Sequence, residues 1–419
     1  MIVRDVTPMR ILYLTPETWP TFRVDVAALF GKYLPRHGIY SDLVTGRTPG
    51  QEGSVEWGGG EAFLCDVTGG QAKKYLKIVL HGIQKLFGAN SSRYDAIQVR
   101  DMPELAVIGL IAAWIKRLPF YYWMSYPTPE GLIELAQERG LSAGLMKFLF
   151  PWVRGRVCRF LLYRVVLPRA NHVFVQSERM RLGMIARGVK ADRMTPVPMG
   201  VDLEDMHPEA IAPADDPRLA NRRVLVYLGT LVPPRRIEFL FDMLAQVRRQ
   251  MPEALLVLVG DTDDDVHRDW LKRQAEKAGV AEHVIWTGWL PMREGWRYLK
   301  ACEVGLSPLP RGFLFDISSP TKVLEYLAMG VPVVCNDSPD QQRVIEESTG
   351  GLCVPYSASE FADAVVKILK LENKARLEMS ERGISYVAEH RDYGLLAGRL
   401  ASVYQLLSLE RRKSQVSLP

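Results

Sequence analysis

The residues with the clearest chemical potential lie in the segment 316–334. Ser319 followed by Pro320 is typical of a helix start, because a serine oxygen accepts hydrogen bonds from free helix N–H groups and proline fits the first helical position. Lys322 then falls in the first turn and Glu325 one turn deeper, off the apolar stripe of the predicted helix. Helix amides beside a lysine suit a diphosphate, and a carboxylate suits a pair of hydroxyl groups. The segment therefore predicts a site for a molecule that carries both.

Helices and strands must hold this segment in place, and the hydrophobic pattern predicts an α/β organisation on both sides of it. Short apolar strands alternate with helical periodicity in both halves of the chain. No G-x-G-x-x-G motif follows the first strand, so the dinucleotide-binding fingerprint is absent. The predicted strands are 9–16, 41–45, 96–100, 120–125, 171–177, 224–230, 255–260, 284–289, 304–308 and 331–334, and the last predicted helix is 393–409.

Length and composition predict two domains. The 419 residues are 47% hydrophobic and 24% charged, which is enough for two sizeable cores. The stretch 206–222 is rich in Pro, Ala and Asp and has little apolar periodicity, so it is the predicted linker. The predicted division is a first domain in 1–205, the linker, a second domain in 223–391, a helix in 392–410 and a polar tail in 411–419.

Charge and cysteine usage limit the partners and the compartment. A net charge of +5 is mild for this length and no nucleic-acid-binding motif is present, so nucleic acid is not an expected partner. The five cysteines have no CxxC spacing, which indicates reduced thiols in a cytoplasmic protein. The N-terminus lacks the features of a signal peptide, and the longest apolar run, 105–115, is too short to span a bilayer.

Residues 141–170 differ from the rest of the chain, because Lys and Arg alternate there with apolar and aromatic residues and no acid is present. Two interpretations are open. A basic amphipathic segment of this kind suits a protein that rests on an anionic membrane surface. Alternatively, the segment packs its apolar side on the domain and leaves its arginines in water. The first interpretation predicts a protein that is peripheral to the inner face of the plasma membrane.

Several motifs resemble those of glycosyltransferase family 4, and the resemblance covers nearly the whole chain. The most specific motif is the segment 320–334. The resemblance implies an α/β structure of the GT-B type, with two Rossmann-like doubly wound domains, a deep cleft between them and a C-terminal helix that crosses back to the first domain. It also implies that a sugar passes with retention from a nucleotide donor to a lipid-linked or glycan acceptor of the bacterial cell surface. The weaker matches, in the family's order and spacing, are 197–202, 227–230, 258–261, 287–288 and 307–308.

The resemblance assigns roles to residues of the second domain. It implies that Lys322 and Arg235 neutralise the donor diphosphate and that Glu325 binds the ribose hydroxyls, so these are the expected catalytic residues. The donor is expected to be a UDP- or GDP-linked sugar. This is a substrate, and no cofactor is expected. The other expected donor-binding residues are Gly229, Thr230, Arg236, Trp289, Leu290, Ser318, Ser319, Pro320 and Thr321.

The chain departs from the family pattern at the sugar and acceptor positions. The family usually carries a glutamate eight positions before Glu325, where this chain has Ile317 beside Asp316. The family's histidine after the fourth strand of the first domain is not evident, and Ser125 or Tyr126 falls near its place. The glycine pair of the first loop is also missing. The acceptor-side candidates are therefore Arg23, Asp25, Ser125 and Tyr126.

Metal independence is expected, because basic side chains take over the neutralisation of the diphosphate. The acidic run 261–265 follows a strand but lacks the glycine and the distal glutamate of a calcium loop, so we expect it to cap the following helix. Three other functions stay open: an epimerase that acts on the nucleotide sugar, a nucleotide-sugar-binding protein without turnover, and a membrane scaffold built on the basic segment.

Overall fold

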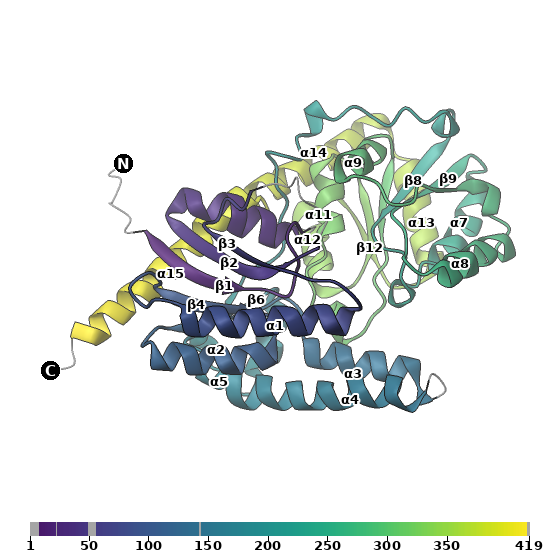
Figure 1. Cartoon of the computed structure of the whole chain (residues 1–419). Coiled ribbons are helices and arrows are strands. Elements are labelled where there is room, and N and C mark those ends of the chain that lie inside the picture. The colour runs from purple at the N-terminus through teal and green to yellow at the C-terminus, as the bar shows by residue number, and fades with distance from the viewer. Residues whose placement is uncertain (1–7, 22, 49–55, 142–143, 417–419) are drawn as a thin grey trace, which may run out of the picture. The chain divides into compact units, whose positions relative to one another are not determined.

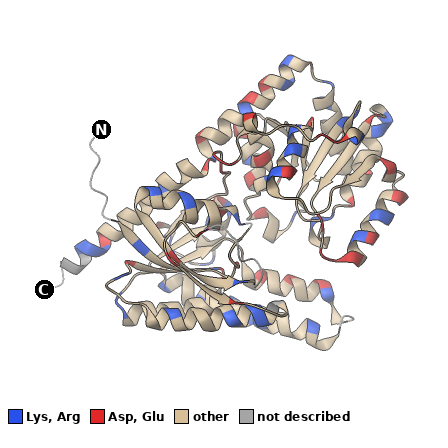
Figure 2. Ribbon diagram, turned by 45° about the horizontal axis from the view of Figure 1, so that its top comes forward, with Lys and Arg blue, Asp and Glu red and all other residues tan. Residues whose placement is uncertain are grey.

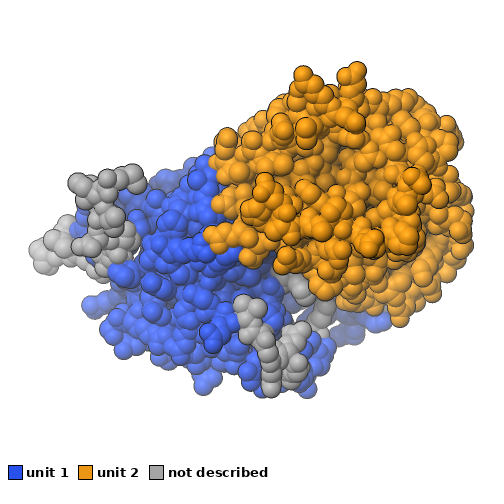
Figure 3. All heavy atoms as spheres, turned by 90° about the horizontal axis from the view of Figure 1, so that it is seen from above, with its two compact units in different colours: residues 1–198, 393–419 blue, residues 199–392 orange. Residues whose placement is uncertain are grey.

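A computed structural model describes residues 8–21, 23–48, 56–141 and 144–416 (Figure 1). The ends of the predicted first domain and polar tail, 1–7 and 417–419, and residues 142–143 of the basic segment lie outside the described residues. The chain divides into two compact units, which Figure 3 colours blue and orange. Unit 1 consists of 1–198 and 393–419, and unit 2 consists of 199–392. The division falls at residue 198, whereas the sequence placed the linker at 206–222. In the structure Met206 and Ile211 are buried in the core of unit 2.

Unit 1 is built on a parallel seven-stranded sheet in the order β3-β2-β1-β4-β5-β6-β7. The chain runs outward from β1 to β3 and then returns to β4, so the topological switch point lies between β1 and β4, where open α/β sheets bind their ligands. The strands are β1 Met9–Leu14, β2 Ile39–Arg47, β3 Ala62–Asp66, β4 Ala96–Arg100, β5 Phe120–Met124, β6 His172–Val175 and β7 Met194–Pro196. The helices are η1 Asp25–Tyr33, η2 Leu34–His37, α1 Gln71–Gly88, α2 Pro103–Ile115, α3 Thr128–Arg139, α4 Leu145–Phe160, η4 Leu161–Val166, α5 Leu167–Arg169, α6 Glu178–Ile185, η5 Ala191–Arg193 and α15 Tyr393–Val416.

The two faces of this sheet are covered by different helices. On one face Tyr13 of β1 stacks on Phe30 of η1, with ring centroids 4.4 Å apart, and the same core includes Tyr404 of α15. The Tyr404 hydroxyl donates to Gln98 Oε1 at 2.6 Å. On the other face α1 approaches so closely that a Cβ at Gly82 would lie 3.2 Å from Leu14 of β1. Because side chains alternate along a strand, this two-sided cover explains the nearly continuous apolar character of the strands.

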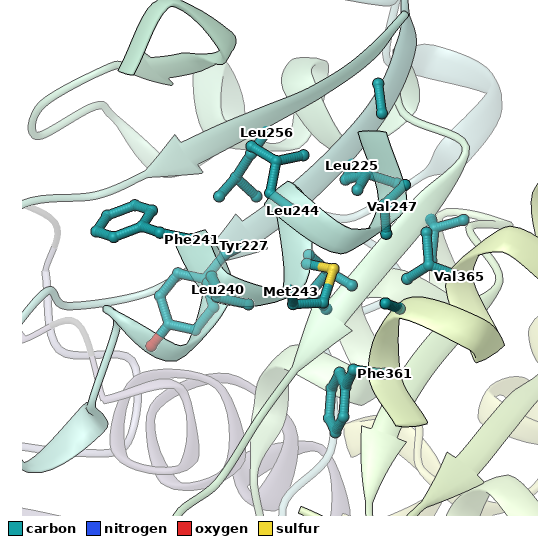
Figure 4. Close-up of a cluster of buried hydrophobic side chains, with 14 of the residues drawn as sticks. Leu225, Tyr227, Leu240, Phe241, Met243, Leu244, Val247, Leu256, Phe361 and Val365 are labelled. Atoms are coloured by element: carbon teal, nitrogen blue, oxygen red, sulfur yellow. The ribbon is translucent and has the colours of Figure 1, made fainter. Parts of the chain in front are cut away.

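Unit 2 contains a parallel six-stranded sheet in the order β10-β9-β8-β11-β12-β13. Figure 4 shows side chains of α7 and α13 packed with those of β8 and β9 in one of its cores. The strands are β8 Arg223–Leu228, β9 Ala254–Val259, β10 Val284–Trp286, β11 Val304–Ser307, β12 Val333–Asn336 and β13 Gly351–Val354. The helices are η6 Pro208–Ala210, η7 Pro217–Leu219, η8 Pro233–Arg235, α7 Phe239–Gln250, α8 Asp265–Lys277, η9 Ala281–His283, α9 Met292–Lys300, α10 Phe313–Asp316, α11 Thr321–Ala328, α12 Pro339–Ser348, α13 Ala358–Leu369 and α14 Asn373–His390.

Two parallel α/β sheets confirm the predicted fold class. The sequence missed the strands β3, β7 and β13 and the helix α1, and it placed only a loop where α3 begins at Thr128. No helix among the described residues is both long enough and apolar enough to cross a bilayer.

Candidate active site

The start of α11 differs in one detail from the sequence prediction, because Ser319 does not cap the helix. Pro320 occupies the N-cap position and supplies no side-chain hydrogen bond. The Ser319 hydroxyl instead donates to Asp340 Oδ2 at 2.6 Å and accepts from the Met199 N–H at 3.0 Å. A hydrogen bond to a carboxylate is stronger than one to a neutral amide, which explains the choice. No side-chain hydrogen bond therefore caps the helix, and the N–H groups of its first turn are left to donate to an anion.

Asp340 is held in turn by Arg391. The Arg391 guanidinium donates to Asp340 Oδ1 at 3.0 Å and to the Met199 carbonyl at 3.3 Å. Arg391 and Ser319 are both buried. This network fixes the loop before α11 at two points of unit 2 that lie far from it in the sequence.

Lys322 is the most unusual side chain of the site. It is only 8% exposed, and its Nζ atom has no hydrogen-bond partner among the residues that the structure describes. The Nζ atom lies 3.9 Å from the centre of the Tyr227 ring, which is a cation–π distance. A Cβ at Gly229, the first residue after β8, would lie 3.6 Å from Nζ. Burial and the nearby charge of Arg235 lower the pKa of Lys322 well below its usual range, because both disfavour the ammonium form.

Arg235 and Arg236 follow β8 on the same short turn but point to different surroundings. Arg235 is half-buried, its guanidinium carbon lies 5.3 Å from the centre of the Phe315 ring, and its charge acts on Lys322. Arg236 is exposed and has a left-handed backbone conformation, with φ 49°. Its charge acts on Tyr356. The structure therefore brings Arg235, and not Arg236, to Lys322.

Glu325 lies one turn along α11 from Lys322 and is half-buried. Its carboxylate accepts a long hydrogen bond of 3.5 Å from the indole N–H of Trp296, on α9. Burial raises the pKa of Glu325, although Trp296 and Lys322 act in the opposite direction. The carboxylate thus has one weak donor and a capacity for more, as a ligand for hydroxyl groups requires. The sequence did not identify Trp296 or Tyr227, because each meets the site only through folding.

The remaining donor-side candidates surround this centre unevenly. Gly229 has φ 143°, and a Cβ at Gly260 would lie 2.2 Å from the Gly229 carbonyl oxygen, so the turns after β8 and β9 are in close contact. Thr230 is exposed. Trp289 is 55% exposed beside the turn at Gly288, while Leu290 packs against the core of unit 2.

The sugar end of the site lacks a free carboxylate at the expected positions. Ile317 is buried, and the Asp316 carboxylate is bound by Arg311 at 2.8 Å. The Ser318 hydroxyl donates to the Phe315 carbonyl at 2.7 Å. Asp316 is therefore already paired and does not replace the missing glutamate.

The acidic run after β9 caps α8, as the sequence predicted. Asp264 Oδ1 accepts from the N–H groups of Val266 and His267, and Asp261 pairs with Arg268 at 2.8 Å. Among the residues that the structure describes, no three His, Cys, Asp or Glu side chains are grouped to hold a metal ion.

Unit 1 contains a second polar cluster, at the carboxyl ends of β1, β4 and β5. Its centre is Arg100, which is fully buried. The Arg100 Nη2 atom lies 2.8 Å from Asp25 Oδ2 and donates to Ser125 Oγ at 2.9 Å. Arg23 also donates to Ser125 Oγ, at 3.2 Å, and Ser125 Oγ donates to Asp101. Three of the four acceptor-side candidates therefore meet at the switch point of the sheet.

The fourth candidate, Tyr126, joins this cluster through its backbone. Its N–H donates to Asp101 Oδ1 at 3.1 Å, and its side chain is 45% exposed. Asp101 has φ 48°, and burial raises its pKa to about 6. The Arg100 Nε atom also donates to Glu17 Oε1 at 3.3 Å. The sequence missed Arg100, Asp101 and Glu17 of this cluster. Their position at the end of a predicted strand or directly after one is the signal that could have found them.

Comparisons with known proteins agree with this arrangement. A family model described as "Glycosyl transferase 4-like domain" matches residues 25–200, and one described as "Glycosyl transferases group 1" matches residues 222–371. A GDP-mannose-dependent alpha-(1-6)-phosphatidylinositol monomannoside mannosyltransferase of Mycobacterium tuberculosis is 30% identical over 211 residues, which are 49% of this chain and 54% of that relative. The chain thus spans about half the length of the curated relatives it matches.

Solved structures resemble the fold over nearly the whole chain. HepE of Anabaena, crystallised with UDP and glucose, has a TM-score of 0.65 and 17% identity, and the match covers 94% of this chain and 99% of HepE. Sucrose-phosphate synthase of Thermosynechococcus elongatus has a TM-score of 0.68 and 16% identity, over 96% and 99% of the two chains. The two matched family models together span most of the sequence, and the chain belongs to the GT4-type glycosyltransferases of the GT-B fold.

Proposed function

We propose that the protein transfers a sugar from a nucleoside diphosphate sugar to an acceptor hydroxyl, with retention of configuration at the anomeric carbon. The observation that carries this proposal is the buried Lys322 amine at the start of α11, which has no hydrogen-bond partner among the described residues and lies in the field of Arg235. Two neighbouring cations repel each other until an anion joins them. A diphosphate supplies such an anion and is also the leaving group of glycosyl transfer.

The side chains of the site have separate roles in the proposed reaction. When the donor bond breaks, negative charge moves onto the departing diphosphate, and Lys322, Arg235 and the first N–H groups of α11 stabilise that charge. Preorganised donors of this kind each contribute on the order of 3 kcal/mol. Glu325 accepts hydrogen bonds from the ribose hydroxyls. We propose that the two cations serve in place of a metal ion.

Donor and acceptor are proposed from the named relatives. The mycobacterial relatives are named as GDP-mannose-dependent enzymes that act on phosphatidylinositol mannosides, which favours GDP-mannose as the donor and a lipid-linked glycan as the acceptor. HepE was crystallised with UDP, so UDP-sugars are the second class to test. The cluster around Arg100 is the proposed acceptor side, because it lies where a parallel sheet presents its loops to a ligand.

A thermal-shift screen of GDP-mannose, UDP-glucose and ADP-glucose tests the donor site. We expect one nucleotide sugar to raise the melting temperature strongly, because only a true donor binds the folded state tightly. Glu325→Ala is expected to weaken nucleotide binding by about 1–3 kcal/mol, which is the usual cost of leaving hydrogen-bond partners unpaired. Glu381→Ala, an exposed glutamate of α14, is the matched control. Unchanged affinity in Glu325→Ala would remove Glu325 from the site.

A transfer assay separates the proposed activity from its alternatives. We expect labelled sugar to appear in an acceptor lipid fraction with the native chain and not with Glu325→Ala or Lys322→Ala. Tight nucleotide binding without any transfer would identify a binding protein that has lost turnover. Conversion of the nucleotide sugar into an epimer, without acceptor, would identify an epimerase.

A further inference from the structure

Three helices of unit 1 turn large apolar side chains outward. On α4 the exposed residues Met146, Phe150, Val153, Val157 and Phe160 recur every three or four positions, so they form one stripe along the helix. A helix on the surface of a water-soluble domain normally carries polar residues on that side. Trp114 of α2 is 81% exposed and Phe160 of α4 is 62% exposed. The other exposed apolar residues of these helices are Leu76, Leu80 and Phe87 on α1, Ile111 and Ile115 on α2, and Leu145 and Leu149 on α4.

The three helices lie together on one side of the unit 1 sheet, where Figure 1 shows α1, α2 and α4 in shades of blue. Glu104 of α2 joins them: its carboxylate accepts from Tyr75 of α1 and from Arg154 of α4, each at 2.8 Å. The Arg154 guanidinium also stacks on the Tyr75 ring, 4.3 Å from its centre. At the other end of α2, Lys116 donates to the Phe87 carbonyl of α1 at 3.0 Å. The exposed apolar side chains therefore belong to a single surface, which we call the three-helix face.

The charge of this face is positive. Its helices carry Lys and Arg side chains and a single acid, Glu104, which Arg154 and Tyr75 already occupy. Figure 2 shows the basic residues as blue bands along these helices. Glu134 and Glu138 lie on the neighbouring α3, where their charges act on Tyr126. The cations of the three helices are Lys73, Lys74, Lys77 and Lys85 on α1 and Lys147, Arg154, Arg156 and Arg159 on α4.

We propose that the three-helix face binds the anionic surface of a lipid bilayer, with its aromatic and aliphatic side chains inserted at the level of the headgroups. Apolar area and cations on one surface match both properties of such a bilayer. A second copy of the chain fits less well, because a symmetric dimer places the same cations opposite each other. The inference rests on the proposed function in one respect: a lipid-linked acceptor explains why the enzyme would bind a membrane. The lipid contact itself depends on unit 1 alone.

The ion pairs of α4 decide which cations of the basic segment remain available for lipid headgroups. Arg154 is paired inward with Glu104, and Arg159 lies 3.8 Å from Glu130 of α3. The exposed cations Lys147 and Arg156 are therefore the better choices for a charge test. The face also extends beyond 141–170, because α1 and α2 supply part of its apolar area.

Flotation with phosphatidylcholine vesicles, with and without about 30 mol % of the anionic lipid phosphatidylglycerol, tests the proposal. The native chain is expected to float with the anionic vesicles and to lose binding as salt rises. Lys147→Gln with Arg156→Gln is expected to weaken binding about fivefold for each cation removed. Binding that is equal on both kinds of vesicle, or that is unaffected by salt, would overturn the electrostatic part.

The decisive variant lies outside the basic segment. Trp114→Gln with Ile115→Gln changes only exposed side chains of α2 and is expected to weaken vesicle binding by more than about tenfold, because two large apolar groups no longer insert. Leu406→Gln with Leu409→Gln, exposed on α15 at the other face of the sheet, is the matched control and should float like the native chain. Equal binding of the α2 variant and the native chain would overturn the three-helix face. So would a dimer in solution that the α2 variant dissociates, because a second copy would then be the occupant.

Nucleotide binding distinguishes this inference from the proposed function. The α2 variant should keep the nucleotide-induced thermal shift of the native chain, since both of its changes lie in unit 1 and the proposed nucleotide site lies in unit 2. A native chain that floats but responds to no nucleotide sugar would refute the proposed function and leave the lipid contact standing.

Discussion

At the scale of single residues, the buried position of Lys322 favours ligand binding and lowers the stability of the ligand-free chain. Its Nζ atom is buried without a hydrogen bond, and the Tyr227 ring compensates only part of the lost hydration. Lys322→Met keeps the length of the side chain and removes the charge. We expect the ligand-free variant to be more stable than the native chain by about 1 kcal/mol and to lose its nucleotide-induced thermal shift. Urea unfolding and thermal shifts measure the two effects.

The opposite signs of these effects make the test informative. A lysine with a purely structural role would lower stability when replaced, and it would leave nucleotide binding largely unchanged. Lys367→Met, on α13 in the same unit, controls for the general effect of removing a positive charge, because Lys367 is exposed. A Lys322→Met variant that is less stable and still binds nucleotide would refute the role of Lys322 as a phosphate ligand.

Asp101 links stability to pH. Burial raises its pKa from 3.8 to about 6 in the folded chain. The folded state therefore holds this proton more tightly than the unfolded state, so the contribution is fully present below pH 3.8 and is lost as pH rises to about 6. The full effect amounts to about 2–3 kcal/mol. Asp101→Asn should flatten this part of the pH profile in denaturant unfolding between pH 4 and about 6.5. A profile identical to that of the native chain would place the titration elsewhere.

At the scale of elements, the sequence predicted best what local patterns determine. The helix that begins at Thr321 follows from apolar spacing, and the cap of α8 follows from an acid directly before a helix. The first edge of the unit 1 sheet, β3, and the helix α1 that follows it were not predicted. β3 is partly buried along most of its length and shows no alternation of buried and exposed residues, whereas α1 is amphipathic and could have been found from its sequence.

The site was predictable only as far as its residues share one segment or one motif. Lys322 and Glu325 belong to a single helix. Arg235 follows β8, whose end is one of the segments that resemble the family's motifs. Trp296 was not predicted, because it meets Glu325 only when α9 packs beside α11. Ser319 was given the wrong role, because its competing partner, Asp340, lies 21 positions away in the sequence. Such tertiary competition has no signature in a local pattern.

The Asp340 network also shows how the donor loop is supported. Ser319, Asp340, Arg391 and the backbone of Met199 form one chain of hydrogen bonds within unit 2. The loop before α11 therefore has a fixed position before any ligand arrives. A preorganised site avoids the cost of ordering the loop when the diphosphate binds.

At the scale of the whole molecule, each unit has its own core, and the core of unit 1 depends on the far end of the chain. Leu400 of α15 is buried among residues of β1 and η1, which lie near the opposite end of the sequence. Leu400→Ala removes buried apolar volume there and is expected to cost about 2–5 kcal/mol. The loss should fall on unit 1, since Leu400 has no part in the cores of unit 2.

Hydrogen exchange measures this effect segment by segment. In Leu400→Ala we expect faster exchange in β1, η1 and α15, and little change in β8, β9 and α11. The donor nucleotide should slow exchange around α11 in the native chain and in the variant alike, because its proposed contacts lie in unit 2. Leu406→Ala, an exposed position of the same helix, should leave both units unchanged. Equal acceleration in the two units would mean that they unfold together, in which case the nucleotide would also protect β1 and α15.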